Sequence, residues 1–182
     1  MGRILSESEV LGAGETATVF AVGDDRVLKL YRAGGPAGWQ AGLARLRDEE
    51  VRAYKISTSD PQLAGHIPHF YGIEEVGAVV DSCGLDISER FLLPLAISLE
   101  RLHGSITKVQ DLAELPSYIR EILEAFEAKG IYAADASVYR PDDAERCKFI
   151  DLTTSLGNLL ACDLVKQNTA GPEELERWFR GE

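Results

Sequence analysis

The chain has 182 residues, of which 45% are hydrophobic and 27% are charged, a composition typical of a soluble globular protein with enough chain for one real core. Its formal net charge of -11 repels phosphate backbones, so nucleic acid is not expected as a partner. No apolar run approaches the ~20 residues of a membrane-spanning helix, and the scattered Cys83, Cys147 and Cys162 fit neither a disulfide framework nor paired zinc ligands. We therefore expect an intracellular, cytoplasmic protein without a membrane span.

The first residues contain a weak address signal. Gly2 after the initiator Met1, with Ser6 further on, formally matches the N-myristoylation pattern. So short a pattern often arises by chance, and it is a minor expectation for this chain.

A β-meander is predicted for the start of the chain. Apolar residues around Val10 precede Gly12-Ala13-Gly14, and the apolar runs Val19–Val22 and Val27–Tyr31 flank a turn at Gly23-Asp24-Asp25. Alternation along the last of these runs places Lys29 on the same face as Val27.

The segment from Trp39 to about Ile56 predicts a helix. Residues spaced by three and four along it, namely Trp39, Leu43, Leu46, Glu50 and Tyr54, form one face. Glu50 is the unusual member, because it places a carboxylate on an apolar stripe.

Further strands of the same antiparallel sheet are expected after this helix. Short apolar segments at Phe70–Ile73, Val76–Val80 and Phe91–Leu95 are separated by Gly- and Asp-rich turns. The remainder reads as mainly helical: Pro116 opens a helical pattern that runs to Lys129 and stops at Gly130, and Pro172 begins a last helix.

Two features of the first half suit phosphate binding. The glycines at Gly12 and Gly14 lie between two predicted strands, which excludes Walker and Rossmann loops, in which a helix follows. Lys29, on the next strand, adds a cation to the backbone donors of the glycine turn. The plain alternatives are an ordinary hairpin and a structural salt bridge of Lys29 with Glu50, or with its neighbour Glu49.

The order of glycine-rich turn, strand lysine and helix glutamate resembles the protein kinase superfamily. Downstream, Gly130–Asp135 resembles its catalytic loop, with Asp135 at the place of the base. Lys148–Leu152 resembles the strand that ends in the metal-binding aspartate, here Asp151. Taken singly, Asp135 reads as a turn residue and Asp151 as a strand-end cap.

The resemblance implies an α+β, two-lobed fold over residues 1–182, with an antiparallel N-lobe carrying one helix over about 1–97 and a reduced helical C-lobe over 98–182. It implies ATP and Mg²⁺ bound between the lobes. The residues it assigns are Asp135, Lys29 and Glu50 for catalysis, Asp151 for the metal, and Gly12, Ala13, Gly14, Val19, Val27, Lys29 and the hinge residues Leu93 and Leu95 for the nucleotide.

Several positions depart from the family pattern. Ala133 and Ala134 replace the His and Arg before the base, and Arg140 replaces the metal-binding asparagine. Asp142 or Asp143 is an alternative oxygen ligand, whereas Arg140 is an alternative phosphate contact.

Three functions follow from these patterns. The first is transfer of the γ-phosphate of ATP to a hydroxyl of a protein acceptor, as in an atypical protein kinase. The alternative is a catalytically inactive pseudokinase that acts as a nucleotide- or partner-binding scaffold. A small-molecule kinase of the aminoglycoside or choline type ranks last, because its histidine-containing loop and larger helical lobe are not found.

Overall fold

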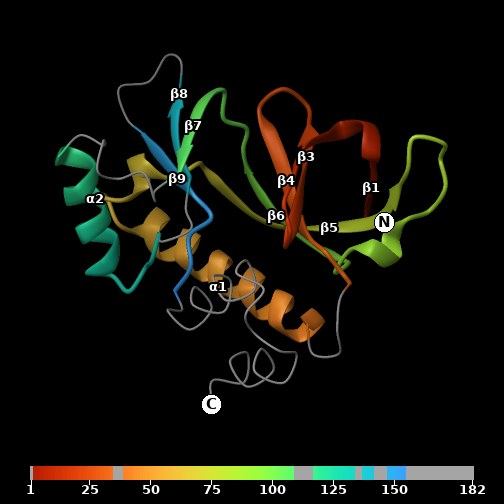
Figure 1. Cartoon of the computed structure of the whole chain (residues 1–182), viewed down its shortest axis with the longest axis horizontal. Coiled ribbons are helices and arrows are strands. Elements are labelled where there is room, and N and C mark those ends of the chain that lie inside the picture. Colours follow the sequence, from red (N-terminus) through yellow and green to blue (C-terminus); the bar gives the residue numbers. More distant parts are fainter. Residues whose placement is uncertain (1, 35–38, 109–116, 134–136, 142–146, 155–182) are drawn as a thin grey trace. The chain divides into compact units, whose positions relative to one another are not determined.

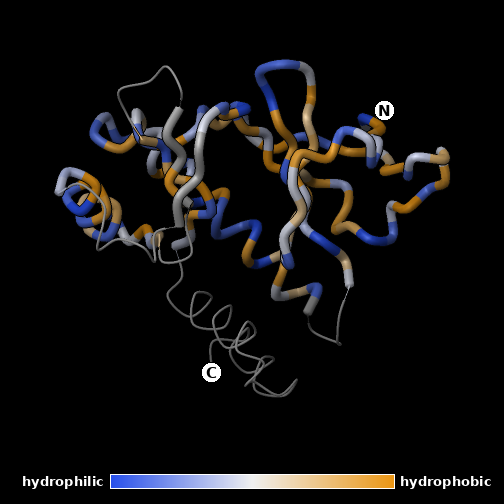
Figure 2. Tube along the Cα trace, turned by 45° about the horizontal axis from the view of Figure 1, so that its top comes forward, coloured by the Kyte–Doolittle hydropathy of each residue, from blue (hydrophilic) through white to orange (hydrophobic). Residues whose placement is uncertain are grey.

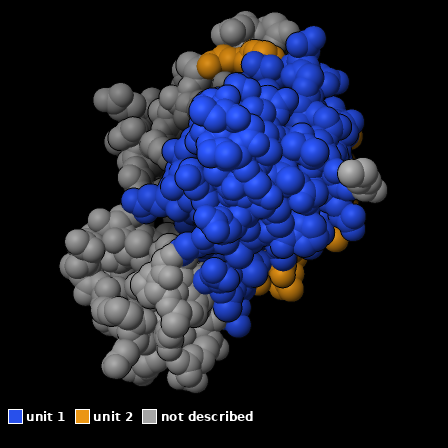
Figure 3. All heavy atoms as spheres, turned by 90° about the vertical axis from the view of Figure 1, so that its right-hand side faces the viewer, with its two compact units in different colours: residues 1–47, 71–101 blue, residues 48–70, 102–182 orange. Residues whose placement is uncertain are grey.

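The computed structural model of the chain describes residues 2–34, 39–108, 117–133, 137–141 and 147–154. The chain divides into two compact units, which Figure 3 colours blue and orange. Unit 1 comprises Met1–Arg47 with Tyr71–Arg101, and unit 2 comprises Asp48–Phe70 with Leu102–Glu182. The fold is a mixture of helices and strands, so the expected α+β class is confirmed at this level.

Unit 1 is built on a six-stranded sheet with the strand order β1-β5-β6-β4-β3-β2. Its strands are β1 (Arg3–Ser6), β2 (Val10–Ala13), β3 (Ala17–Val22), β4 (Arg26–Tyr31), β5 (Phe70–Val80) and β6 (Leu95–Glu100). Short 3-10 turns at Glu7–Glu9 and Ser88–Arg90 connect some of them.

The expected β-meander is confirmed. Strands β2, β3 and β4 pair antiparallel in chain order. Gly23 in the β3–β4 turn has φ 73°, a left-handed conformation that glycine adopts without strain, which explains why the turn falls there. Figure 1 shows β3 and β4 side by side.

Other parts of the sheet differ from the sequence expectation. The sheet is mixed rather than wholly antiparallel, because β1 runs parallel to β5. The segments Phe70–Ile73 and Val76–Val80 form the single strand β5, and the last strand begins at Leu95 instead of ending there. Pro94 accounts for the shift, since a residue without an N–H does not continue a strand ladder.

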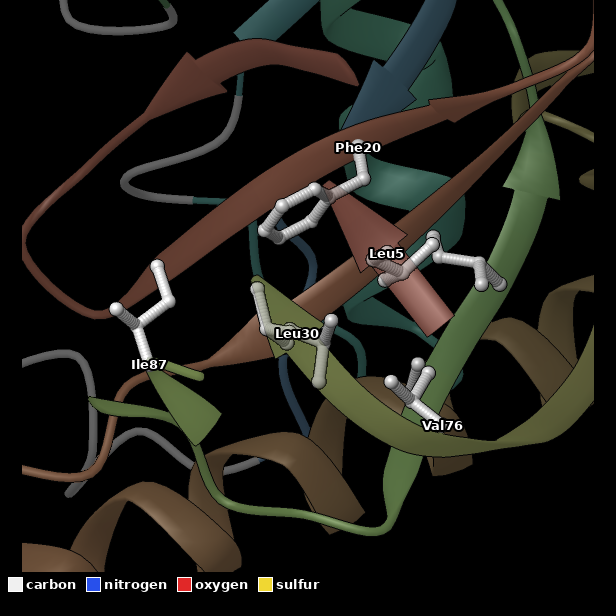
Figure 4. Packing of buried hydrophobic residues seen from close by; sticks show 8 residues of the cluster. Leu5, Phe20, Leu30, Val76 and Ile87 are labelled. Carbon is white, nitrogen blue, oxygen red and sulfur yellow. The ribbon is translucent and has the colours of Figure 1, made fainter. Parts of the chain in front are cut away.

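One buried cluster of unit 1 lies on one face of this sheet (Figure 4). The cluster comprises Leu5, Phe20, Leu28, Leu30, Val76, Val79, Ile87 and Ala96. Phe20 also meets the ring of Phe91 edge-on, with 5.7 Å between centroids. Each large apolar side chain buried here contributes about 1.5–3 kcal/mol relative to exposure.

Unit 2 contains most of the long helix α1 (Trp39–Ser59), the helix α2 (Ser117–Glu127) and a second sheet of order β7-β8-β9. The strands are β7 (Gly104–Lys108), β8 (Ser137–Pro141) and β9 (Lys148–Ile150), paired antiparallel. The expectation of a mainly helical second half is therefore wrong for the described residues. The helix expected after Pro172 lies outside them.

Two of the three predicted helices lie in the described residues, and both are present. The helix expected over Trp39–Ile56 is confirmed as α1. Helix α2 is amphipathic, as the mixed hydropathy along it in Figure 2 shows, and buries Ile119 and Phe126. The chain turns at Gly130, φ 69°, where the sequence predicts a helix stop.

Aromatic pairs mark the core of unit 2. Phe126 meets Phe149 of β9 edge-on at 5.5 Å between centroids, and Tyr54 of α1 stacks on Phe70 at 5.7 Å.

In the part of the chain that the structure describes, no helix is both long and apolar enough to cross a bilayer.

Candidate functional site

The meander places three of the expected nucleotide-binding residues on one face of the unit 1 sheet. Val19 of β3 is the register partner of Lys29 of β4, and Val27 lies two residues from Lys29 on the same strand. This is the face opposite the core cluster, to which Phe20 and Leu28 belong. The expected grouping of Val19, Val27 and Lys29 is therefore present.

Lys29 is a buried charge, with only 9% of its surface exposed. Its Nζ lies 5.5 Å from the ring centroid of Tyr31, two residues along β4. An ammonium group so buried requires compensating negative charge or π density, because desolvation alone strongly disfavours it. Lys29 is therefore not a solvated surface lysine.

The glycine-rich turn leaves its backbone accessible. Gly12, Ala13 and Gly14 are exposed, and the β2–β3 register shifts between Val10 and Gly12. A Cβ placed on Gly12 would meet nothing within 4 Å. The Gly14 N–H donates to the carbonyl of Ala17 at 2.8 Å. A ligand can therefore approach the backbone at Gly12 without displacing protein atoms.

The structure does not bring the expected hinge residues together with Lys29 in the way the sequence suggests. Leu93 packs against the core cluster, on the face opposite Lys29, and its N–H donates to the carbonyl of Phe91 at 3.0 Å. Leu95 opens β6, on which Ile97 pairs with Lys29, so alternation places Leu95 on the lysine's face. Leu93 precedes the last strand of the sheet and Leu95 begins it, so neither residue follows that strand.

Helix α1 carries the two candidate glutamates. Glu50 is only 2% exposed, consistent with its predicted place on the inward stripe. Glu49, the alternative partner considered for Lys29, instead accepts a hydrogen bond through Oε2 from the hydroxyl of Thr154. Sequence reasoning missed Thr154, because no local pattern links a threonine to a glutamate so distant in the chain.

Asp151 lies in an uncommon backbone conformation at the end of β9. Its φ is 62°, in the left-handed region, where aspartate is found more often than most residues other than glycine. The side chain is half-buried. Such outliers persist only where the surrounding structure fixes them, and they cluster at functional sites.

Backbone pairing on both sides holds the Asp151 segment. Thr153 and Tyr132 exchange two hydrogen bonds, with N–O distances of 2.7 and 3.0 Å. On the other side, Ile150 of β9 is paired with Ser137 of β8. The expected base, Asp135, belongs to the interval between Tyr132 and Ser137 and lies outside the described residues, as do Asp142 and Asp143.

The expected metal ligand, Asp151, is among the described residues. No group of three or more His, Cys, Asp or Glu side chains gathers among the residues that the structure describes. Mg²⁺ is usually held by one or two carboxylates together with substrate phosphates and water. A single half-buried carboxylate such as Asp151 suits that mode of binding.

No protein-family model matches the chain, and no curated protein matches it.

Proposed function

We propose that this chain is a kinase-like protein that binds ATP with Mg²⁺ and transfers the γ-phosphate to a hydroxyl of a protein acceptor. The observation that carries the proposal is the pairing around Asp151. The segments on either side of Asp135 pair, at Tyr132 and Ser137, with those on either side of Asp151, at Thr153 and Ile150. Asp135, the proposed base, follows Tyr132 by three residues in the chain, and its own placement lies outside the described residues.

Each residue then has a chemical role. The exposed backbone at Gly12–Gly14 covers the phosphates, Val19 and Val27 contact the adenine ring, and Lys29 orients the phosphates. Mg²⁺, when bound at Asp151, supplies neutralisation of phosphate charge.

Asp135 accepts the proton of the acceptor hydroxyl. The hydroxyl oxygen forms a bond to the γ-phosphorus, and the bond between this phosphorus and ADP breaks. Glu50 as the counter-charge of Lys29 stays a prediction. The burial of both charged groups supports it, because buried charges require compensation.

The proposed fold is the two-lobed fold of the protein kinases. Its support is the order of elements: an accessible glycine turn between antiparallel strands, a buried lysine on the next strand, and a helix with a buried glutamate. The turn that carries Asp151 after β9 extends this order into unit 2.

Thermal unfolding with and without ATP and Mg²⁺ tests nucleotide binding. A ligand at 100 times its Kd adds about 2.7 kcal/mol to stability, a shift of several degrees for a chain of this size. We expect the shift in the wild type and in Lys55→Met, which removes an exposed lysine, and its loss in Lys29→Met. Asp151→Asn should remove the Mg²⁺-dependent part. Absence of a shift in the wild type would overturn the proposal.

Transfer of labelled phosphate separates the active enzyme from a pseudokinase. Ala133 favours the second candidate, since this buried apolar side chain, 8% exposed, stands where the family has a histidine two residues before the base. Nucleotide binding without transfer to any protein acceptor would assign the scaffold function. Loss of transfer in Asp135→Asn, with ATP binding retained, would assign the enzyme.

A further inference from the structure

One contact in unit 2 joins α1 directly to the segment that follows Asp151. The Thr154 hydroxyl donates to Oε2 of Glu49, a carboxylate whose side chain is 18% exposed. A hydrogen bond to a charged acceptor is roughly twice as strong as one between neutral groups, and partial burial limits competition from water. This contact, hereafter the Glu49–Thr154 latch, is therefore more than a surface interaction.

Glu49 has one weaker neighbour of opposite charge. Nη1 of Arg52 lies 3.9 Å from Oε1 of Glu49, and the arginine side chain is 67% exposed. Ion pairs of this exposure and length contribute little. The Thr154 bond is thus the stronger of the two contacts described for Glu49.

The latch is one of the contacts that hold the chain on either side of Asp151. Asp151 has the left-handed φ of 62°, a conformation that most residues other than glycine avoid. Strand β9 fixes the chain before Asp151. After it, Leu152 is buried at 2% exposure, Thr153 pairs with Tyr132, and Thr154 bonds to Glu49.

We propose that Glu49 is a positioning residue that acts through Thr154 to hold the Asp151 carboxylate in place for Mg²⁺. This inference rests on the proposed nucleotide function. Loss of the latch removes this restraint on Thr154, weakens the Tyr132–Thr153 pair and lets Asp151 leave its left-handed conformation. The protein then requires more Mg²⁺ to bind ATP, although ATP binding without the metal is unchanged.

Amide hydrogen exchange on the nucleotide-free protein tests the holding role. The amides of Tyr132 and Thr153 both donate in the bridge and report its opening. We expect Thr154→Val, which keeps the shape and removes the hydroxyl, to accelerate their exchange about tenfold or more. Thr154→Ser should stay near the wild type. Arg52→Gln, the matched control on α1, should change nothing.

A Mg²⁺ titration at constant ATP, followed by thermal shift, tests the link to the metal. We expect Thr154→Val and Glu49→Gln to need several-fold more Mg²⁺ for half of the stabilisation. Thr154→Ser and Arg52→Gln should follow the wild type. Denaturant unfolding of each variant without ligand controls for a general loss of stability. If Thr154→Val does not fold, Glu49→Gln, which keeps an acceptor oxygen, replaces it as the test variant.

The outcomes separate this inference from the proposed function. Wild-type exchange rates and Mg²⁺ midpoints in Thr154→Val would overturn the inference while leaving nucleotide binding intact. If the wild type binds no nucleotide, the proposed function fails and the metal part of the inference fails with it. The exchange rates then still decide whether Glu49 holds the Asp151 turn.

Discussion

Gly2 lies against the backbone of Gly77, so closely that a Cβ on Gly2 would stand 2.6 Å from the Gly77 nitrogen. The contact falls where β1 joins β5, beside an irregularity in the parallel register between Arg3 and Ile4. The requirement for glycine at position 2 therefore has a packing cause. The same residue carries the weak N-myristoylation pattern.

Gly2→Ala should lower the free energy of unfolding by about 1–3 kcal/mol, because the added methyl group meets backbone atoms that cannot move aside without shifting β1. Gly12→Ala is the matched control, since nothing lies within 4 Å of its Cβ position, and it should stay within about 0.5 kcal/mol of the wild type. Urea unfolding of the unmodified protein checks both. Equal midpoints would contradict the packing account, whereas lipid attachment is a separate question that mass spectrometry answers.

Two fully buried serines should respond in opposite ways to alanine. Ser57 is 0% exposed, and its Oγ has no hydrogen-bond partner among the residues that the structure describes. An unsatisfied buried hydroxyl is destabilising, so Ser57→Ala should leave stability unchanged or raise it by about 1 kcal/mol. Ser98, also 0% exposed, donates to Oε1 of Glu74 at 2.7 Å.

Ser98→Ala should therefore lower stability by about 1–3 kcal/mol, because Glu74 loses a buried donor and keeps only Arg26 at 2.9 Å among its described partners. Denaturant unfolding of the two variants side by side provides the comparison. A loss in Ser57→Ala as large as that in Ser98→Ala would show that the Ser57 hydroxyl has a partner, such as a buried water.

Substitutions of Asp151 should separate backbone strain from charge. At φ 62°, alanine is strained where glycine is not, so Asp151→Ala should unfold more easily than Asp151→Gly by about 1 kcal/mol. Asparagine tolerates this conformation, which makes Asp151→Asn the appropriate variant for metal-binding experiments. Thermal unfolding without ligand checks the order, and equal stability of the alanine and glycine variants would argue against the left-handed turn.

The elements that local patterns specify could be predicted from the sequence. The meander follows from apolar runs separated by a glycine turn, and α1 and α2 follow from their helical spacing. Strand β1 was missed because its four residues carry no alternation and pair with the distant β5. The run Phe91–Ile97 is apolar throughout, so its pattern does not show where the strand lies, and the expected Phe91–Leu95 was placed too early.

The charged residues of the candidate site could be predicted from the sequence, but the backbone conformation and the hydrogen bonds around them could not. Lys29 and Glu50 stand out because charge within an apolar pattern is unusual, and both are buried. Asp151 was found by resemblance, whereas its left-handed φ and the Tyr132–Thr153 pair depend on tertiary structure. The partner of Glu49 could not be chosen from spacing, since Lys29 and Thr154 both lie far from it in sequence.

The Lys129–Asp60 ion pair in unit 2 should make stability depend on pH in acid. Nζ of Lys129 lies 2.8 Å from Oδ2 of Asp60, and this hydrogen bond is the main reason that the pKa of Asp60 falls below its ordinary value of 3.8. The N–H of Gln62, 2.9 Å from Oδ1, lowers the pKa further.

A carboxylate with a lowered pKa in the folded state stabilises the protein above its unfolded pKa, and that contribution is lost as the pH falls through the folded pKa. Lys129→Met should therefore be less stable than the wild type at neutral pH, and the difference should shrink in acid. Urea midpoints of both proteins, measured from about pH 7 down to about pH 2, follow this difference in stability. In the Asp60→Asn background the effect of Lys129→Met should not vary with pH, because the titrating partner is gone. A difference that persists unchanged into acid would show that Lys129 stabilises the chain through its packing at the end of α2 rather than through Asp60.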